Sequence, residues 1–297
     1  MTCTNSPAPR VSVVIPVFND DAGLHTCLES IERQSYPLSA IEVLVVDNGS
    51  SPPIAISGSY SFELRTLRCE KPGSYAARNL GAAHHGGEYL AFIDADCWAH
   101  QDWIREAVRC HSKHGGSAVV GGDVLIARPD APSAVALYQC ATGFGQEANV
   151  RDRQFAATAN LFCSASQFNM TGPFEERLLS GGDREWCWRA VKRGLRVRFC
   201  PSAIVHTRPR SDLSGAIRQA RRVAAGRRMV TRLGLAHVGQ DGLSRPRSAG
   251  QSVLWILRHR ELGLADRLRV LSVAMLIRAA ATIESLRLAL GFAAERR

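Results

Sequence analysis

The sequence predicts an α/β fold with a mostly parallel central sheet, helices on both faces of that sheet, and a C-terminal helical region. Short β-branched apolar runs alternate with segments of helical periodicity over the first two thirds of the chain. These runs lack the polar alternation of a half-exposed sheet, which indicates strands that are buried on both faces. After His206 the composition changes to Arg-rich stretches of helix-forming residues. Together the three observations favour a sheet that alternates with helices, followed by a helical appendage.

The chain opens with a β-α-β unit. VSVVIPV (11–17) is typical of a buried parallel strand, and either Asp20 or Asp21 caps the helix that follows it. Leucine and isoleucine recur at helical spacing until SYP closes that helix. IEVLVVD (41–47) is the second buried strand, and it ends in the turn-rich loop DNGSSPP.

The alternation continues with a weaker strand at 64–69, a helix at 74–85 and a strong buried strand at 88–94. In a parallel sheet the carboxyl ends of the strands share one edge, and ligands bind there. The third strong strand ends in FIDAD, so this edge is predicted to carry two acids.

The rest of the first unit is less regular. A helix near 101–113 and a strand near 118–126 are followed by an excursion at 128–158, which shows no clear period. The segment 182–194 is typical of a helix that a glycine ends, and an extended segment is expected at 197–206.

Beyond this point we predict a basic helix at 214–234, the linker SRPRS and nearly continuous helix formers at 251–294. The change of character places a boundary near 207, between a catalytic domain of residues 1–207 and a basic helical region of residues 208–297.

Charge is distributed unevenly between these two units. Net charge is +10, and residues 206–297 hold 18 Arg against 6 acids. Such asymmetry indicates an anionic membrane surface or a nucleic acid as partner, or arginines that merely solvate surface helices. Only Trp255 and Phe292 are aromatic after residue 207, which disfavours RNA because bases stack on aromatic rings.

The segment 264–292 mixes arginines with apolar residues, and it is too charged to span a membrane but suited to lie at its surface. A helical cap on the catalytic domain or on a second subunit is equally compatible with this pattern. The nine cysteines form no CxxC pair and the N-terminus lacks an apolar signal region, so we expect a cytoplasmic protein, associated at most with the inner face of the membrane.

Asp94 and Asp96 are the first candidates for chemistry. Along an extended chain both side chains point one way while Ala95 points the other, which places two oxygen ligands near one ion. Such ligands suit Mg²⁺ or Mn²⁺, which keep positions open for substrate oxygens. One such triplet is expected by chance in a chain of this length, so two exposed loop acids are the alternative.

Five segments in order carry a resemblance to a known family: VSVVIPVFNDDAGLHTCLESIERQSYP, VLVVDNGSS, KPGSYAARNLGAAHHGGEYLAFIDAD, NMTGPFEERLLSGGDREWCWRAVKRG and FCPSAIVHT. Over residues 11–207 the chain resembles the family 2 glycosyltransferases, whose fold is of the Rossmann-like GT-A type. The resemblance implies a nucleotide diphosphate-sugar donor, with UDP-sugars favoured, a divalent cation (Mn²⁺ or Mg²⁺) and an inverting mechanism.

The resemblance assigns nucleotide binding to the ends of the first two strands. Pro16, Val17 and Asp47 match positions that hold the nucleoside, and Arg78 matches a position that lines the nucleotide pocket. A carboxylate such as Asp47 accepts hydrogen bonds from a uracil N–H or a ribose hydroxyl, although an Asx turn in DNGSS is the alternative role.

By the same resemblance Asp94 and Ala95 contact the ribose and sugar, and Asp96 reaches the metal on the diphosphate. Asp94 and His206 join Asp96 in the expected metal site. A lone histidine at a strand end is otherwise structural, so both roles stay open for His206.

Asp183 matches the catalytic base of the family, and Glu185 is the second acid of the same segment. The family more often has Glu-Asp here, and Gly182 stands in place of that Glu. We assign the base to Asp183 and a structural or acceptor-binding role to Glu185, while an N-cap is the alternative role for Asp183. Trp186 and Trp188 beside the base either stack on sugars or fill the helix core.

The predicted function is therefore transfer of a sugar to a sugar, lipid-linked or small-molecule acceptor hydroxyl, in the synthesis of a cell-envelope glycan, a glycolipid or a related glycoconjugate. A catalytically degenerate nucleotide-sugar-binding protein is the main alternative. A nucleotidyltransferase is a weaker one, because NDDAGLH is not the Gly- and Arg-rich loop which that class places after the first strand.

Overall fold

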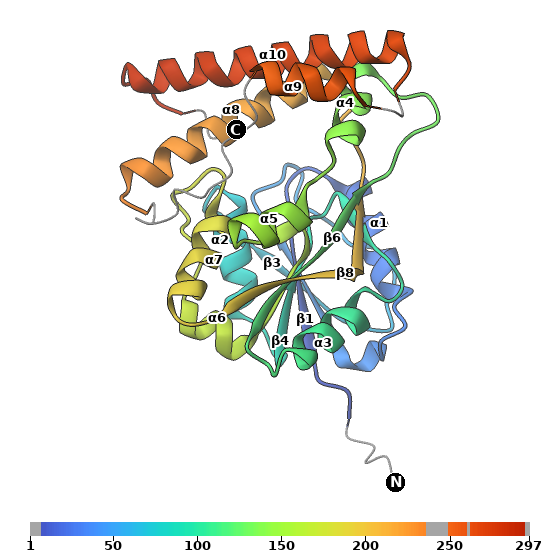
Figure 1. The fold of residues 1–297 in the computed structure, drawn as a ribbon. Helices are drawn as coiled ribbons and strands as arrows, with labels where there is room; N and C mark the ends of the chain where they lie inside the picture. The colour runs from blue at the N-terminus through green and yellow to red at the C-terminus, as the bar shows by residue number, and fades with distance from the viewer. Residues whose placement is uncertain (1–6, 236–248, 260–261, 295–297) are drawn as a thin grey trace.

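The structure, a computed structural model, describes residues 7–235, 249–259 and 262–294. Figure 1 shows one sheet with helices on both faces and a layer of C-terminal helices beyond one end of it. The sheet has the order β3-β2-β1-β4-β7-β6-β8-β5. Its strands are β1 (Val11–Val17), β2 (Ile41–Asp47), β3 (Glu63–Arg68), β4 (Tyr89–Phe92), β5 (Cys97–Ala99), β6 (Ala118–Ile126), β7 (Leu161–Ser164) and β8 (Arg196–Thr207).

The helices agree with the expected alternation through the first unit. Asp20 caps the first helix by accepting a hydrogen bond from Gly23 N at 2.9 Å. The helices are α1 (Asp21–Glu32), α2 (Ser74–Ala83), α3 (Trp103–Lys113), α4 (Ala134–Thr142), α5 (Gln146–Arg153), α6 (Ala165–Thr171), α7 (Gly182–Lys192), α8 (Leu213–Arg232), α9 (Ala249–Leu257) and α10 (Leu264–Ala289).

Strand pairing sets the position of the site. β1 pairs in parallel with β2 and β4, and β2 pairs in parallel with β3. β7 is antiparallel to both β4 and β6, while β6 and β8 are parallel. The carboxyl ends of β1, β2 and β4 therefore lie together at one edge, as the sequence predicts. The sequence did not predict β7, which has only four residues.

The two faces of the sheet are covered by separate apolar cores. Residues of α1 and α3, with Trp103 fully buried, pack on one face, and residues of α2, α6 and α7 pack on the other. Trp186 and Trp188 belong to the second core, and their indole N–H groups donate to Gly172 O and Arg153 O. Both therefore fill the helix core and do not stack on a sugar.

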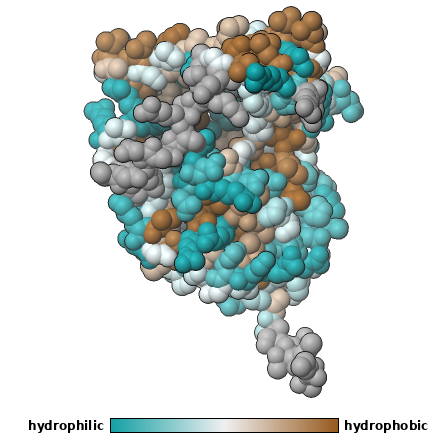
Figure 2. All heavy atoms as spheres, viewed as in Figure 1, coloured by the Kyte–Doolittle hydropathy of each residue, from teal (hydrophilic) through white to brown (hydrophobic). Residues whose placement is uncertain are grey.

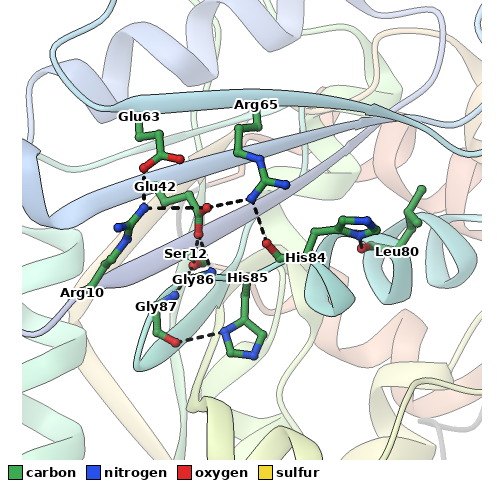
Figure 3. A network of polar contacts seen from close by, with 10 residues as sticks. All are labelled: Arg10, Ser12, Glu42, Glu63, Arg65, Leu80, His84, His85, Gly86 and Gly87. Atoms are coloured by element: carbon green, nitrogen blue, oxygen red, sulfur yellow. Dashed lines mark hydrogen bonds and ion pairs between the residues drawn. The ribbon is translucent and has the colours of Figure 1, made fainter.

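At the amino ends of the strands a buried carboxylate ties several segments together (Figure 3). Ser12 Oγ and Gly86 N donate to Glu42 at 2.5 Å and 2.8 Å, and Arg65 Nη1 donates at 3.2 Å. The Arg10 guanidinium lies 3.8 Å away. Because each oxygen of Glu42 has a partner, these contacts offset the cost of burying its charge and join the segments at the end of the sheet that lies opposite the site.

The excursion at 128–158 contains α4 and α5, and α4 packs against the C-terminal helices. Leu137 of α4 shares a small apolar cluster with Ile256 of α9 and Val270 of α10. The C-terminal helices therefore share a core with a segment that precedes residue 207. The linker SRPRS lies outside the described residues, and in the described part of the chain no helix is long and apolar enough to cross a membrane.

Helix α8 also packs on the catalytic unit. Val230 belongs to the core on the α7 side of the sheet. A Cβ atom at Gly226 would lie 2.3 Å from Ser180 O, so the backbone of α8 touches the loop that leads into α7. This contact seats the C-terminal helices beside the start of α7.

Candidate active site

The ends of β1 and β2 form the first part of the site. Val17 pairs directly with Asp47 across these strands. Asn48 N donates to Val17 O at 2.8 Å, which fixes the loop after β2 against the end of β1. Pro16 is partly buried just before this point. The structure thus brings together the three side chains expected to hold a nucleoside, and their contact with one stays a prediction.

The Asp47 carboxylate is already held by three groups of the protein. Ser50 N and Ile54 N donate to it at 2.8 Å and 3.2 Å, and Arg68 Nη1 forms an ion pair with it at 2.5 Å. Burial alone would raise the pKa of Asp47, but these hydrogen bonds outweigh burial and lower that pKa. Asp47 therefore stays charged and fixes the loop after β2, but its bonds reach three and seven residues further along the chain, and not the residue two positions on that an Asx turn uses.

Arg78 fixes the first acid of the FIDAD segment. It is buried on α2, where its Nη2 forms an ion pair with Asp94 Oδ1 and its guanidinium lies 5.5 Å from the Tyr75 ring centroid. A guanidinium at this position can pair either with the donor or with a nearby acid, and in the structure Arg78 pairs with the acid. The ion pair holds the Asp94 carboxylate in one orientation at the end of β4.

The two acids lie in a turn and not on an extended strand. β4 ends at Phe92, and Cys97 N donates to Asp94 O at 3.1 Å, so the chain has already begun to turn at Asp94. Ala95 is buried while Asp96 is exposed, and 36% of the Asp94 side chain is accessible. The expected extended geometry is wrong in this detail, yet both carboxylates remain at the edge of the sheet.

These carboxylates suit a divalent cation. Partial enclosure by protein raises the pKa of Asp96, and the neighbouring charge of Asp94 raises it further. A cation between the two acids would relieve this repulsion, and hard oxygen ligands are those that Mn²⁺ and Mg²⁺ prefer. Among the described residues no three His, Cys, Asp or Glu side chains gather into a metal site. Oxygens of a diphosphate and water would complete the coordination.

Asp183 lies within the first turn of α7. The N-cap of this helix is Gly181 in a left-handed conformation, so the N-cap role considered for Asp183 is wrong. Its Oδ1 accepts a hydrogen bond from Arg184 N at 2.8 Å, and the Tyr75 hydroxyl lies 3.4 Å away. Burial raises the pKa of Asp183 in spite of the nearby arginines. A carboxylate whose charge is disfavoured in this way is suited to accept a proton.

Tyr75 also explains why Gly182 stands where the family more often has Glu. A Cβ atom at Gly182 would lie 2.7 to 2.9 Å from carbons of the buried Tyr75 ring, so a larger side chain would force that ring to move. The hydroxyl of that ring is the group that approaches Asp183. Sequence reasoning missed Tyr75, because nothing in SYAARN shows that the ring crosses to α7.

Comparison with known proteins identifies the family. The model for Glycosyl transferase family 2 matches residues 12–132, and the model for Glycosyl transferase family group 2 matches residues 89–293. Glycosyltransferase AglE of Haloferax volcanii is 38% identical over 204 residues, which cover 67% of each chain. The chain belongs to glycosyltransferase family 2.

Other relatives agree with this membership in family 2. The pre-mycofactocin glycosyltransferase of Mycobacterium tuberculosis is 30% identical over 220 residues, which are 70% of this chain but 45% of that protein. The mannosyltransferase PcManGT of Pyrobaculum calidifontis, in complex with GDP-Man and Mn²⁺, superposes with a TM-score of 0.57 at 18% identity and covers 95% of this chain and 79% of its own. TarS of S. aureus (residues 1–349), in complex with UDP-GlcNAc, superposes with a TM-score of 0.53 at 15% sequence identity. The superposition covers 95% of this chain and 92% of the TarS chain. Both structures have the GT-A fold predicted from the sequence.

In this family 2 glycosyltransferase Glu185 has a structural environment. It is buried, and Arg189 Nε and Nη2 donate to its two oxygens at 2.6 Å and 3.0 Å. Arg189 also donates to the carbonyls of Thr171 and Pro173, both at 2.6 Å. These contacts favour the structural role for Glu185, because both of its oxygens are occupied in fixing the segment between α6 and α7.

His206 of the glycosyltransferase lies on β8, opposite Trp98 of β5. The two rings stack with their centroids 5.6 Å apart. Burial lowers the pKa of His206, and the nearby His100 lowers it further, so the neutral imidazole is favoured. A neutral imidazole is the form that binds metals, and the metal role of His206 stays a prediction.

Proposed function

We propose that the enzyme is an inverting glycosyltransferase that moves a sugar from a nucleotide diphosphate-sugar, with UDP-sugars favoured, to an acceptor hydroxyl. The reaction would serve the synthesis of a cell-envelope glycan, a glycolipid or a related glycoconjugate. One observation carries the proposal. Tyr75 and Arg78, one turn apart on α2, hold the base candidate Asp183 and the donor-side acid Asp94, respectively. One rigid helix thus connects an acceptor-side acid with a donor-side acid.

Each acid has a distinct task in this proposal. Asp183 takes the proton of the acceptor hydroxyl as its oxygen attacks the anomeric carbon of the donor. Asp94 and Asp96 would hold the divalent cation, which, when bound, neutralises the charge of the departing nucleoside diphosphate. The raised pKa of Asp183 and the repulsion between Asp94 and Asp96 support these assignments.

The structural relatives support a nucleotide-sugar as the donor, but they do not decide between uracil and guanine as its nucleobase. PcManGT is described in complex with GDP-Man and Mn²⁺, and TarS in complex with UDP and with UDP-GlcNAc. The preference for uridine rests on the resemblance that assigned Asp47 to the nucleoside. A degenerate nucleotide-sugar-binding protein remains the alternative, and it differs by binding the donor without transferring the sugar.

Calorimetric titration with UDP and with GDP, each with and without Mn²⁺, tests the donor site. We expect metal-dependent binding of one nucleotide, its loss in Asp96→Ala and its retention in Asp183→Asn. Transfer should be lost in both variants. Retained transfer in Asp183→Asn would contradict the base assignment, and binding without transfer by the wild-type protein would favour the degenerate alternative.

We also propose peripheral contact with an anionic membrane through α10. Leu264, Leu268, Met275, Ile283 and Leu290 of α10 or its C-terminus are all more than half exposed, and Figure 2 shows apolar side chains along the top of the molecule, over α9 and α10. The arginines in this segment suit acidic headgroups. Flotation with vesicles that contain anionic lipid should carry the protein upward. If the protein floats neither with neutral vesicles nor with anionic vesicles, the proposed membrane contact is excluded.

A further inference from the structure

A groove of about 1230 Å³ lies between α8 and α10, and none of the acids described above lines it. Part of its wall is small or apolar, and this part includes Ala220 and Ala224 of α8 and Ile277, Ala281 and Leu288 of α10. Four arginines line the same groove: Arg227, Arg228, Arg232 and Arg278. Apolar walls with several guanidinium groups match a ligand that joins an apolar chain to an anion.

One end of this groove approaches the base. Gly226 touches Ser180, three residues before Asp183, and Arg227 is the next residue of α8 and lines the groove. Arg184, directly after Asp183, has a buried Nε that makes no hydrogen bond within the described residues. The lining of the groove therefore begins one residue from the contact that joins α8 to the loop before Asp183.

Positive charge is in excess at this end of the groove. Burial lowers the pKa of Arg184, and the charges of Arg227 and Arg153 lower it further, while Asp183 opposes them. Partial enclosure by protein also lowers the pKa of Arg227, although its side chain is exposed. In the described part of the chain neither Arg184 nor Arg227 has a carboxylate within ion-pair distance. An anion placed between these guanidinium groups would relieve their repulsion.

We propose, resting on the transferase function above, that the acceptor is a sugar joined through phosphate to a long apolar chain. Its phosphate binds Arg227 and Arg184, its sugar hydroxyl faces Asp183, and its chain lies in the groove between α8 and α10. In the reaction the hydroxyl oxygen bonds to the anomeric carbon of the donor. The bond from that carbon to the diphosphate oxygen breaks, its electron pair leaves with the nucleoside diphosphate, and the hydroxyl proton passes to Asp183.

The path of the chain explains why the exposed apolar residues of α10 lie where they do. The groove is lined by one side of α10, and Leu268, Met275 and Leu286 are exposed on the same helix. An acceptor anchored in a membrane would therefore leave the groove next to the surface that contacts the membrane. The two features become parts of one acceptor path.

Farnesyl phosphate, kept below its micelle-forming concentration, is a probe with both parts of this ligand. Farnesol lacks the phosphate, and inorganic phosphate lacks the chain. By calorimetry we expect the wild-type protein to bind farnesyl phosphate at least tenfold more tightly than either of these. Equal binding of inorganic phosphate would show a site for free anions only, and equal binding of farnesol would show a nonspecific apolar surface; either result overturns the proposal.

Matched variants separate a specific site from diffuse charge. Arg227→Ala should weaken farnesyl phosphate binding tenfold or more, since a charge-assisted contact is lost. Arg222→Ala removes the same charge from an exposed position of α8 that does not line the groove, and it should change little. Ala281→Phe should fill the groove, so that the affinity for farnesyl phosphate falls while that for inorganic phosphate stays the same. Equal losses in Arg227→Ala and Arg222→Ala would overturn the proposal.

The same preparations should be titrated with UDP and GDP in the presence of Mn²⁺. Normal nucleotide binding in all three variants shows that they are folded and that the donor site is intact. If nucleotide binds and farnesyl phosphate does not, the acceptor proposal fails while the transferase function stands. If no nucleotide binds, the proposed function fails, and the binding of farnesyl phosphate still decides independently whether the groove holds a lipid phosphate.

Discussion

Gly226→Ala is the substitution that tests most directly whether α8 must be seated on the catalytic unit. The new Cβ atom would lie 2.3 Å from Ser180 O and 2.9 Å from two further atoms of Ser180. Ordinary van der Waals contact begins near 3.4 Å, so the helix and the loop must separate by about 1 Å. Because the blocking atom is a backbone carbonyl, a side-chain rotation cannot relieve the clash.

Two opposing free energies decide the outcome. Replacing Gly by Ala inside a helix is favourable by about 1 kcal/mol. Overpacking of a tight contact typically costs about 1–3 kcal/mol. We therefore expect a net loss of up to about 2 kcal/mol, because the contact is well inside the van der Waals limit. Urea denaturation followed by circular dichroism would measure this loss as a lower midpoint.

Gly250→Ala is the matched control, because a Cβ atom at Gly250 of α9 would have no neighbour within 4 Å among the residues that the structure describes. This variant should be as stable as the wild type or slightly more stable. A denaturation midpoint for Gly226→Ala that equals or exceeds the wild-type midpoint would refute the argument. The same shift of α8 should weaken farnesyl phosphate binding without affecting nucleotide binding, which we predict to depend on the ends of β1, β2 and β4.

Two further predictions concern pH. Hydrogen bonds to Glu42 outweigh the effect of burial and hold the pKa of Glu42 below its ordinary value of 4.5. The charged carboxylate therefore contributes its full stability above pH 4.5. This contribution is lost as the pH falls through the lower pKa of the folded state. Glu42→Gln should therefore lower the free energy of unfolding, measured by urea denaturation, by about 1.5–3 kcal/mol at pH 7. This difference between the variant and the wild type should become smaller below pH 4.5. A difference that does not depend on pH would contradict the prediction. Burial raises the pKa of Asp183, so kcat/KM should fall on the acid side at a pH above the ordinary value of 3.8, and a profile that is flat down to pH 4 would argue against Asp183 as the base. Since the charged form of Asp183 costs stability at pH 7, Asp183→Asn should unfold at the same temperature as wild type or at a higher one.

The parallel half of the sheet could be predicted from sequence because each strand is a buried apolar run with a clear end. β1 and β2 have the predicted bounds, and Asp20 caps α1 as expected. β7 and α4 could not be predicted in the same way. β7 has only four residues, and the apolar face of α4 packs on helices that lie more than 100 residues further along the chain. Sequence periodicity does not show such distant partners.

The site shows the same division between local and distant information. Asp94 and Asp96 were placed correctly at the edge of the sheet because they directly follow a buried strand. The surroundings of Asp183 depend on α2, which precedes it by about a hundred residues, and on the Tyr75 ring, which a larger side chain at Gly182 would displace. A motif comparison registers Gly182 only as a missing acid, whereas packing shows that an aromatic ring occupies that space.

This replacement changes how the two halves of the reaction are connected. The family more often has a second acid at this position. In this chain the Tyr75 ring occupies that space, and its hydroxyl approaches Asp183. The next turn of the same helix carries Arg78, which holds Asp94 and adds positive charge near Asp183. A neighbouring Glu would raise the pKa of Asp183 further by repulsion, whereas the neutral hydroxyl does not. The base therefore keeps a pKa that burial has raised, without the larger increase that a second buried carboxylate would impose.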